Sequence, residues 1–163
     1  NVGQIPIYYN MKNVSKPMDQ WFQKFRSGYL DVTNEPLYPF GYGLSYSQFE
    51  HSDITLSAET MDSNGEIKAS VTVTNTGKYD GKEIVQLYLC DVISSVTRPL
   101  KELKGFEKVE IKAGESKKVE FTITTEQLKF YNYDLNYVYE PGEFIVMIGG
   151  NSRDVKSSKF ILN

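Results

Sequence analysis

Alternation of apolar and polar side chains is the feature that most constrains how this chain can fold. Residues 66–75 and 116–124 show it most clearly, because every second side chain in their middle is apolar. Successive side chains of a β-strand point to opposite faces, so a period of two gathers the apolar residues on one face. The pattern indicates antiparallel strands that bury one face and leave the other in water.

Two further segments, residues 84–89 and 144–148, are apolar at nearly every position, which is typical of central strands covered on both faces. Turn sequences such as Asn64-Gly65 and Pro141-Gly142 lie between the apolar segments and support tight hairpins. About seven strands at this spacing predict an all-β fold, an immunoglobulin/fibronectin type III-like antiparallel β-sandwich. We expect strands near 53–61, 66–75, 82–91, 102–111, 116–124, 136–139, 143–149 and 157–162. One helical turn is expected at 125–129, capped by Thr125.

Residues 1–50 have a different character, and we call them the arm. They contain 11 of the 22 aromatic residues, yet prolines and glycines interrupt them throughout. Disordered segments are poor in aromatic residues, so we expect an irregular N-terminal arm that packs against something. Residues 5–9 are expected to form a short strand. The predicted organisation is therefore an arm over 1–50 and a β-sandwich domain over 51–163.

Composition argues against several classes of function. The net charge is −3 with scattered basic residues, so no nucleic-acid partner is expected. No apolar run reaches the roughly 18 residues that indicate a membrane span. The chain has one cysteine and one histidine and lacks a phosphate-cradling loop, so we expect no metal site and no cofactor. Cys90 is interpreted as a buried structural thiol, and His51 as a partly exposed turn residue.

Two long motifs allow a more specific interpretation. Residues 36–46 read PLYPFGYGLSY, and residues 95–109 read SVTRPLKELKGFEKV. Both resemble the corresponding stretches of family 3 glycoside hydrolases of the β-glucosidase type. Residues 2–10 are similar to the end of the family's α/β sandwich domain, and residues 140–152 to the last strands of its fibronectin type III-like domain. The resemblance covers nearly the whole chain in the right order.

This resemblance implies an accessory role. Family members hydrolyse terminal β-D-glucosyl residues with two carboxylates, and both carboxylates lie upstream of the region that this chain resembles. We therefore expect no catalytic residue here. The resemblance implies that the chain stabilises or positions the upstream catalytic domains of the same polypeptide, whose substrate is a carbohydrate. It also implies a periplasmic or extracellular location. Tyr29 and Asp31 resemble a loop near the active-site rim, and are candidates for substrate contacts.

Two alternatives remain open at this point. The parent enzyme could be a β-xylosidase or another exo-β-glycosidase, because pocket residues elsewhere set the choice of sugar. The chain could instead be a stand-alone carbohydrate-binding module, in which aromatic residues of the arm stack on sugar rings. Prolines and glycines interleave with those aromatic residues, which favours packing of the 36–46 motif as a joint between two domains over direct sugar binding.

Overall fold

The computed structural model describes residues 3–12, 29 and 32–163. It confirms the predicted all-β sandwich, and the described residues form eleven strands and one short helix. They are β1 (Phe49–His51), β2 (Thr55–Leu56), β3 (Thr60–Met61), β4 (Glu66–Asn75), β5 (Gly81–Asp91), β6 (Glu102–Ile111), β7 (Ser116–Thr124), α1 (Thr125–Leu128), β8 (Phe130–Tyr131), β9 (Tyr137–Val138), β10 (Gly142–Gly149) and β11 (Val155–Leu162).

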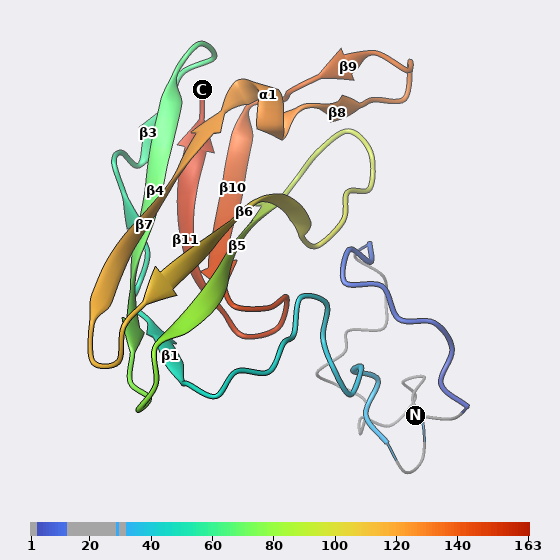
Figure 1. The fold of residues 1–163 in the computed structure, drawn as a ribbon. Coiled ribbons are helices and arrows are strands. Elements are labelled where there is room, and N and C mark those ends of the chain that lie inside the picture. The colour runs from blue at the N-terminus through green and yellow to red at the C-terminus, as the bar shows by residue number, and fades with distance from the viewer. Residues whose placement is uncertain (1–2, 13–28, 30–31) are drawn as a thin grey trace.

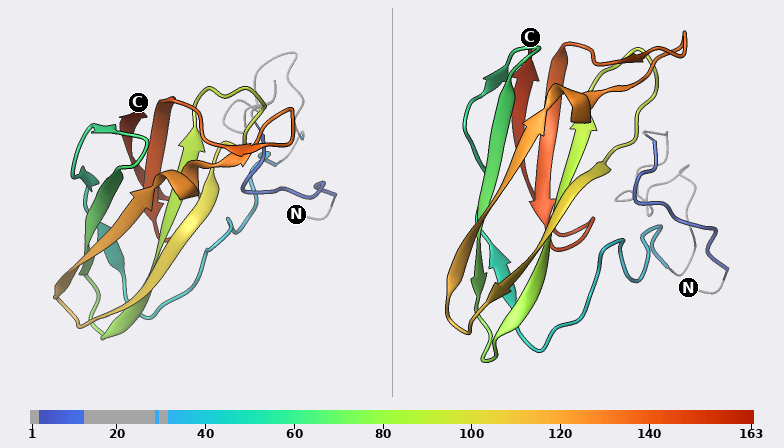
Figure 2. Two further views of the ribbon diagram at one scale, coloured as in Figure 1. Left: turned by 90° about the horizontal axis from the view of Figure 1, so that it is seen from above. Right: turned by 45° about the horizontal axis from the view of Figure 1, so that its top comes forward.

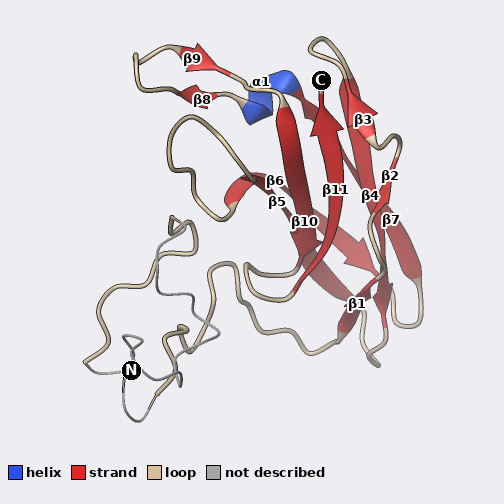
Figure 3. Ribbon diagram, turned by 180° about the vertical axis from the view of Figure 1, so that it is seen from behind, coloured by secondary structure: helices blue, strands red, loops and turns tan. Residues whose placement is uncertain are grey.

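Two sheets form the layers of the sandwich (Figures 1 and 2). In the first sheet β4 lies between β7 on one side and β1 and β2 on the other. The second sheet has the order β3-β11-β10-β5-β6, so the two segments predicted to be central, β5 and β10, do lie inside it. The pairs are antiparallel except for β3 with β11, and β8 and β9 form a separate hairpin. Figure 3 shows this hairpin extending beyond the two layers.

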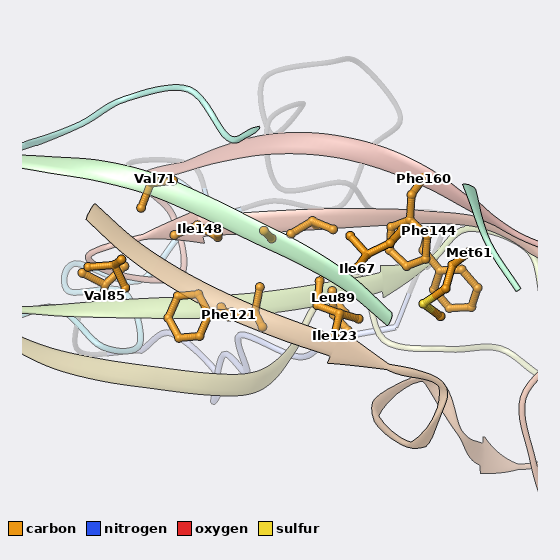
Figure 4. Close-up of a cluster of buried hydrophobic side chains, with 14 of the residues drawn as sticks. Met61, Ile67, Val71, Val85, Leu89, Phe121, Ile123, Phe144, Ile148 and Phe160 are labelled. Atoms are coloured by element: carbon orange, nitrogen blue, oxygen red, sulfur yellow. The ribbon is translucent and has the colours of Figure 1, made fainter. Parts of the chain in front are cut away.

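The sandwich is held by apolar side chains from the facing surfaces of the two sheets (Figure 4). The first sheet contributes the alternating residues that the sequence pattern identified, including Ile67, Val71 and Phe121. Phe144 of β10 and Phe160 of β11 stack with ring centroids 5.5 Å apart at one end of this core. Because the interior is packed from both sheets, the sandwich has a core of its own.

The predicted single strand over 53–61 is wrong. The segment pairs first with β4 through Thr55 and Leu56, and then crosses to the second sheet, where Thr60 and Met61 pair with β11. A segment that changes sheets cannot stay in one hydrogen-bonded ladder, so the predicted strand is divided into two short strands, β2 and β3. The additional strand β1 precedes it and pairs with the end of β4.

Two smaller expectations also differ from the structure. Residues 5–9 form no strand, because a strand needs a neighbouring strand and, among the described residues, this part of the arm pairs only through the bridge between Lys12 and Pro99. The helical turn is present as α1 and leads from β7 to the separate hairpin β8–β9, but its N-cap is Thr124 rather than Thr125. The amide N–H of Thr124 donates to Oε1 of Gln127 at 3.0 Å.

No helix in the described part of the chain is long and apolar enough to cross a membrane.

A pair of isoleucine substitutions tests the position of the core. Ile148 on β10 is fully buried, whereas Ile161 on the neighbouring β11 is 50% exposed. We expect Ile148→Ala to lower the free energy of unfolding by about 2–5 kcal/mol, because it leaves a cavity between the sheets. We expect Ile161→Ala to cost about 1 kcal/mol or less. Urea denaturation followed by circular dichroism measures both, and equal losses would contradict this description of the core.

Candidate functional site

The described residues do not assemble a catalytic constellation. No group of three or more His, Cys, Asp and Glu side chains among them is placed to hold a metal ion. His51 lies in β1 rather than in a turn, with Nε2 at 3.8 Å from Oε1 of Glu83. Burial lowers the pKa of His51 and raises the pKa of Glu83, so the surroundings favour the neutral form of both groups. The pair joins β1 of the first sheet to β5 of the second.

Cys90 lies near the end of β5 and is half-buried. Burial raises the pKa of its thiol, and the nearby carboxylates of Asp91 and Glu102 act in the same direction. A thiol needs a lowered pKa to act as a nucleophile at neutral pH. The surroundings of Cys90 therefore suit the structural role predicted from the sequence.

The site that the structure does build is a joint between the arm and the outer face of the second sheet. Its centre is Gln86 of β5, a buried amide. The Nε2 atom donates to the carbonyl oxygens of Gly150 at 2.7 Å and Gly41 at 3.3 Å, while Oε1 accepts from the hydroxyl of Tyr88. A buried amide without partners would cost free energy, so these hydrogen bonds hold the arm and the β10–β11 loop on the sheet.

Gly41 is the residue of the 36–46 motif that allows this approach. Its φ of +78° is in the left-handed region, and a Cβ at this position would collide with the side-chain amide of Gln86. The turn is closed by the amide N–H of Tyr42, which donates to the carbonyl of Pro39 at 3.0 Å. A glycine is therefore required at residue 41 both for the backbone conformation and for space.

Aromatic rings cover the joint. Tyr9 stacks on Phe40 with centroids 4.2 Å apart and an interplanar angle of 18°. The ring of Tyr9 also packs edge-on against the ring of Tyr88, with ring centroids 5.9 Å apart. Burial raises the pKa of Tyr88 to about 12, with Tyr9 adding to the shift, so its hydroxyl remains a hydrogen-bond donor at neutral pH. The arm residues 9 and 40 thus exclude water from the Gln86 amide.

The second motif contacts the arm in the same region. The carbonyl of Phe40 accepts from the amide N–H of Ser152 at 2.8 Å, and the carbonyl of Ser152 accepts from Nζ of Lys101. The amide N–H of Leu100 donates to the carbonyl of Met11 at 2.9 Å. Three segments far apart in the sequence, 9–12, 39–41 and 99–101, are therefore tied to one side of the sandwich.

A second buried polar residue fixes the end of the arm. Asn75 of β4 is fully buried, and its Oδ1 accepts from the hydroxyl of Ser47 at 2.8 Å and the amide of Gly77 at 3.0 Å. Its Nδ2 donates to the carbonyls of Tyr79 at 2.8 Å and Ile111 at 3.0 Å. The residue therefore fixes where the arm enters the sandwich relative to the β4–β5 and β6–β7 connections.

The packing of the 36–46 motif is divided between two sides. Pro39 is buried and Gly41 contacts Gln86, as a joint requires. Leu44 and Tyr46, in contrast, are 90% and 96% exposed. The exposed rings of Tyr38 and Tyr42 lie 5.2 Å apart at an angle of 34°. The sandwich thus covers one side of the motif and leaves the other side free.

Sequence reasoning did not identify Gln86 or Asn75. A signal was present for Gln86, since it is the one polar residue in the apolar run 84–89. The hydroxyl of Tyr29, one of the two candidate rim residues, accepts from the amide N–H of Ile5 at 2.8 Å, which is a contact within the arm. The other candidate rim residue, Asp31, lies outside the described residues.

Comparison with known proteins agrees with this architecture. A family model described as a fibronectin type III-like domain matches residues 83–152. The periplasmic β-glucosidase of Salmonella typhimurium is 52% identical over 163 residues, which are 99% of this chain and 21% of the relative. A putative β-xylosidase of Formosa agariphila is 51% identical over 162 residues, covering 99% of this chain and 20% of the relative.

A solved structure extends the similarity to the whole chain in three dimensions. The β-glucosidase from Listeria innocua in complex with glucose superposes with a TM-score of 0.90 at 43% sequence identity, covering 99% of this chain and 22% of that protein. The chain thus spans about a fifth of the length of the relatives it matches. It belongs to the family 3 glycoside hydrolases of the β-glucosidase type, and corresponds to their carboxyl-terminal portion with its fibronectin type III-like domain.

Proposed function

We propose that this chain is the accessory carboxyl-terminal domain of a retaining β-glucosidase and that it stabilises or positions the upstream catalytic domains. The observation that carries this proposal is the divided packing of the 36–46 motif. One side of the motif is fixed by Gln86 and Ser152, while Leu44 and Tyr46 on the other side are exposed. A segment held rigidly with apolar side chains facing water is suited to bind a further protein surface.

The arm is well prepared for such a contact. Three hydrogen bonds to the carbonyl oxygens of Met11, Phe40 and Gly41 hold the arm segments 9–12 and 39–41 on the sandwich, so a second domain that binds these segments does not have to order them first. We propose that the arm, over residues 1–50, carries the end of the preceding α/β domain and the linker, and that the sandwich domain occupies 51–163. The sandwich then serves as a support for the arm segments 9–12 and 39–41.

The chemistry would come from the rest of the polypeptide. Hydrolysis by the proposed parent enzyme uses a nucleophile and an acid/base carboxylate, and we propose that both lie upstream. Among the relatives, one is named a periplasmic β-glucosidase and another a putative β-xylosidase, so a β-xylosidase parent is the alternative. The name of the first relative also supports a periplasmic or extracellular location. Tyr29 and Asp31 remain proposed contacts at the active-site rim.

A second candidate function is a stand-alone carbohydrate-binding module. The exposed ring pair of Tyr38 and Tyr42 favours it, since exposed aromatic faces can stack on sugar rings. The two rings are tilted by 34° rather than coplanar, and the apolar Leu44 lies close by in the sequence. These features favour a protein surface over a flat sugar chain. Calorimetric titration of the chain with cello- and xylo-oligosaccharides separates the two functions, because saturable binding supports the module.

The accessory role makes a direct prediction about activity. We expect the purified 163-residue chain to give no turnover of nitrophenyl β-D-glucoside, because it lacks the carboxylate pair that the reaction needs. The longer polypeptide that contains it should hydrolyse the same substrate. Release of nitrophenol measured by absorbance checks both statements. A rate that grows in proportion to the concentration of the chain alone would overturn the proposal.

The joint makes a prediction about coupling between the arm and the sandwich. Gly41→Ala introduces a Cβ at positive φ that collides with Gln86, so we expect it to lower the free energy of unfolding by about 1–3 kcal/mol. The amide of Ser152, which donates to Phe40, should also exchange its hydrogen faster.

The matched control for this substitution is Gly43→Ala. A Cβ at residue 43 would meet nothing within 4 Å, so the free energy of unfolding should stay the same or rise by about 0.4–1 kcal/mol, and the Ser152 amide should exchange no faster than in the parent chain. Hydrogen exchange followed by NMR reports both variants. If the two alanine variants behave alike, Gly41 is not a structural requirement of the joint.

A further inference from the structure

The hairpin β8–β9 exposes apolar side chains at its tip. Tyr133 is 88% exposed and Leu135 is 79% exposed. Both lie in the five-residue segment that joins the two strands. Tyr131 and Tyr137 are also exposed at the base of this segment and pair with ring centroids 5.0 Å apart. The joint described above does not involve any of these four residues.

The backbone conformation of Leu135 is a second, independent observation. Its φ is +63°, and it is the one described non-glycine residue with positive φ. A left-handed conformation costs a non-glycine residue about 1–2 kcal/mol, and asparagine or glycine avoids most of that cost. A leucine that gains nothing from burial in this chain is therefore an unfavourable choice for a simple turn. Such strain is found where a side chain has a role outside the local fold.

The tip is also held in one conformation. Oδ1 of Asn132 accepts from the amide N–H groups of Asp134 at 3.1 Å and Asn136 at 3.0 Å. Backbone hydrogen bonds join Asn132 to Asn136 at 3.0 Å and Leu135 to Asn132 at 3.1 Å. The side chain of Asn132 thus acts as a brace, and the exposed residues are presented with little freedom. A binding partner would lose little conformational entropy at this tip.

The hairpin is connected to the arm through the β5–β6 loop, residues 92–101. The guanidinium of Arg98 lies 4.4 Å from the ring centroid of Phe130 at the base of the hairpin. The carboxylate of Glu140, just after β9, accepts from the amide and the hydroxyl of Ser95. The same loop is tied to Met11, so arm, loop and hairpin all extend on one side of the sandwich (Figures 1 and 3).

We propose that the β8–β9 tip, through Tyr133 and Leu135, docks into an apolar pocket on the preceding part of the same polypeptide. The inference rests on the proposed function and names a second contact for it, separate from the arm. The relatives are about five times as long as this chain, so most of such a polypeptide lies outside the structure. The arm leaves the sandwich at β1, at the end opposite the hairpin, and its described residues then lie on the same side of the sandwich as the hairpin (Figure 1).

The size of the tip also favours a partner within the same polypeptide. A stable interface between separate proteins buries at least about 1,000 Å², whereas a fully buried aromatic side chain removes about 150–250 Å². Two side chains are therefore too small an interface for a second copy of the chain. A covalent connection raises the effective concentration of the partner, so a small contact is sufficient there. The tip carries one charge, on Asp134, and offers no basic group to a nucleic acid.

Hydroxyl-radical footprinting of side chains tests this directly. In the isolated chain Tyr133 and Leu135 should be modified rapidly, as their exposure requires. In the longer polypeptide we expect their modification to slow by about tenfold, the factor that corresponds to 1.4 kcal/mol. Tyr79, which is 64% exposed in the turn between β4 and β5, is the internal control and should react equally in both proteins.

The variant Leu135→Asn supplies a second readout with opposite expectations. It relieves the left-handed strain, so the melting temperature of the isolated chain should not fall. In the longer polypeptide the same substitution removes the docked side chain, and the melting temperature should fall. Equal modification of Tyr133 in both proteins, or a parallel effect of Leu135→Asn on both, overturns the proposal.

If the tip binds a second copy of the chain or a glycan instead, the footprinting result differs, and either result overturns the proposed docking within one polypeptide. Protection that disappears on dilution of the longer polypeptide indicates a second copy, and protection that needs added laminari- or cello-oligosaccharide indicates a glycan. Deletion of residues 51–163 from the longer polypeptide tests the underlying function separately. If this deletion leaves activity and stability unchanged, the accessory role fails. If the deletion is harmful but Tyr133 stays exposed, the docking of the hairpin alone fails.

Discussion

The position of the arm on the sandwich depends on the side-chain amide of Gln86, which donates to the carbonyl of Gly41 in the arm. It projects from the outer face of a central strand, where an apolar residue would give the arm nothing specific to bind. Its two polar atoms engage Gly41, Gly150 and Tyr88, so the position of the arm is set by hydrogen-bond geometry rather than by apolar contact alone. The rings of Tyr9 and Phe40 then shield these bonds from water.

Most of the sandwich could be predicted from the sequence because its physical signal is local. The alternating residues of β4 and β7 face the core as the period of two required, and β5 and β10, whose central residues are apolar at nearly every position, lie inside their sheet. Each strand carries its own pattern, so its two faces can be assigned without knowledge of its neighbours. The same holds for α1, where the error was one residue in the position of the cap.

The features that escaped prediction depend on partners distant in sequence. The segment over 53–61 reads as one strand, but its change of sheet follows from where the edges of β4 and β11 lie. The role of Gln86 requires Gly41, 45 residues earlier, and Gly150, 64 residues later. The left-handed Leu135 breaks a local rule of turn chemistry, and such departures are expected where another demand outweighs local preference. The motif 36–46 was predicted to pack as a joint between two domains, but its local sequence does not tell that Pro39 is buried on the sandwich while Leu44 and Tyr46 are exposed.

The contribution of β11 to the core determines the order in which the chain can acquire structure during synthesis. Phe160 and Leu162 are fully buried, so the second sheet cannot close until the last strand has left the ribosome. The arm is synthesised before the sandwich, but the surface that receives it includes Gly150 and Ser152, next to β11. The arm therefore reaches its place on the sandwich only after β11 has joined the sheet, and until then its contacts with that surface cannot form.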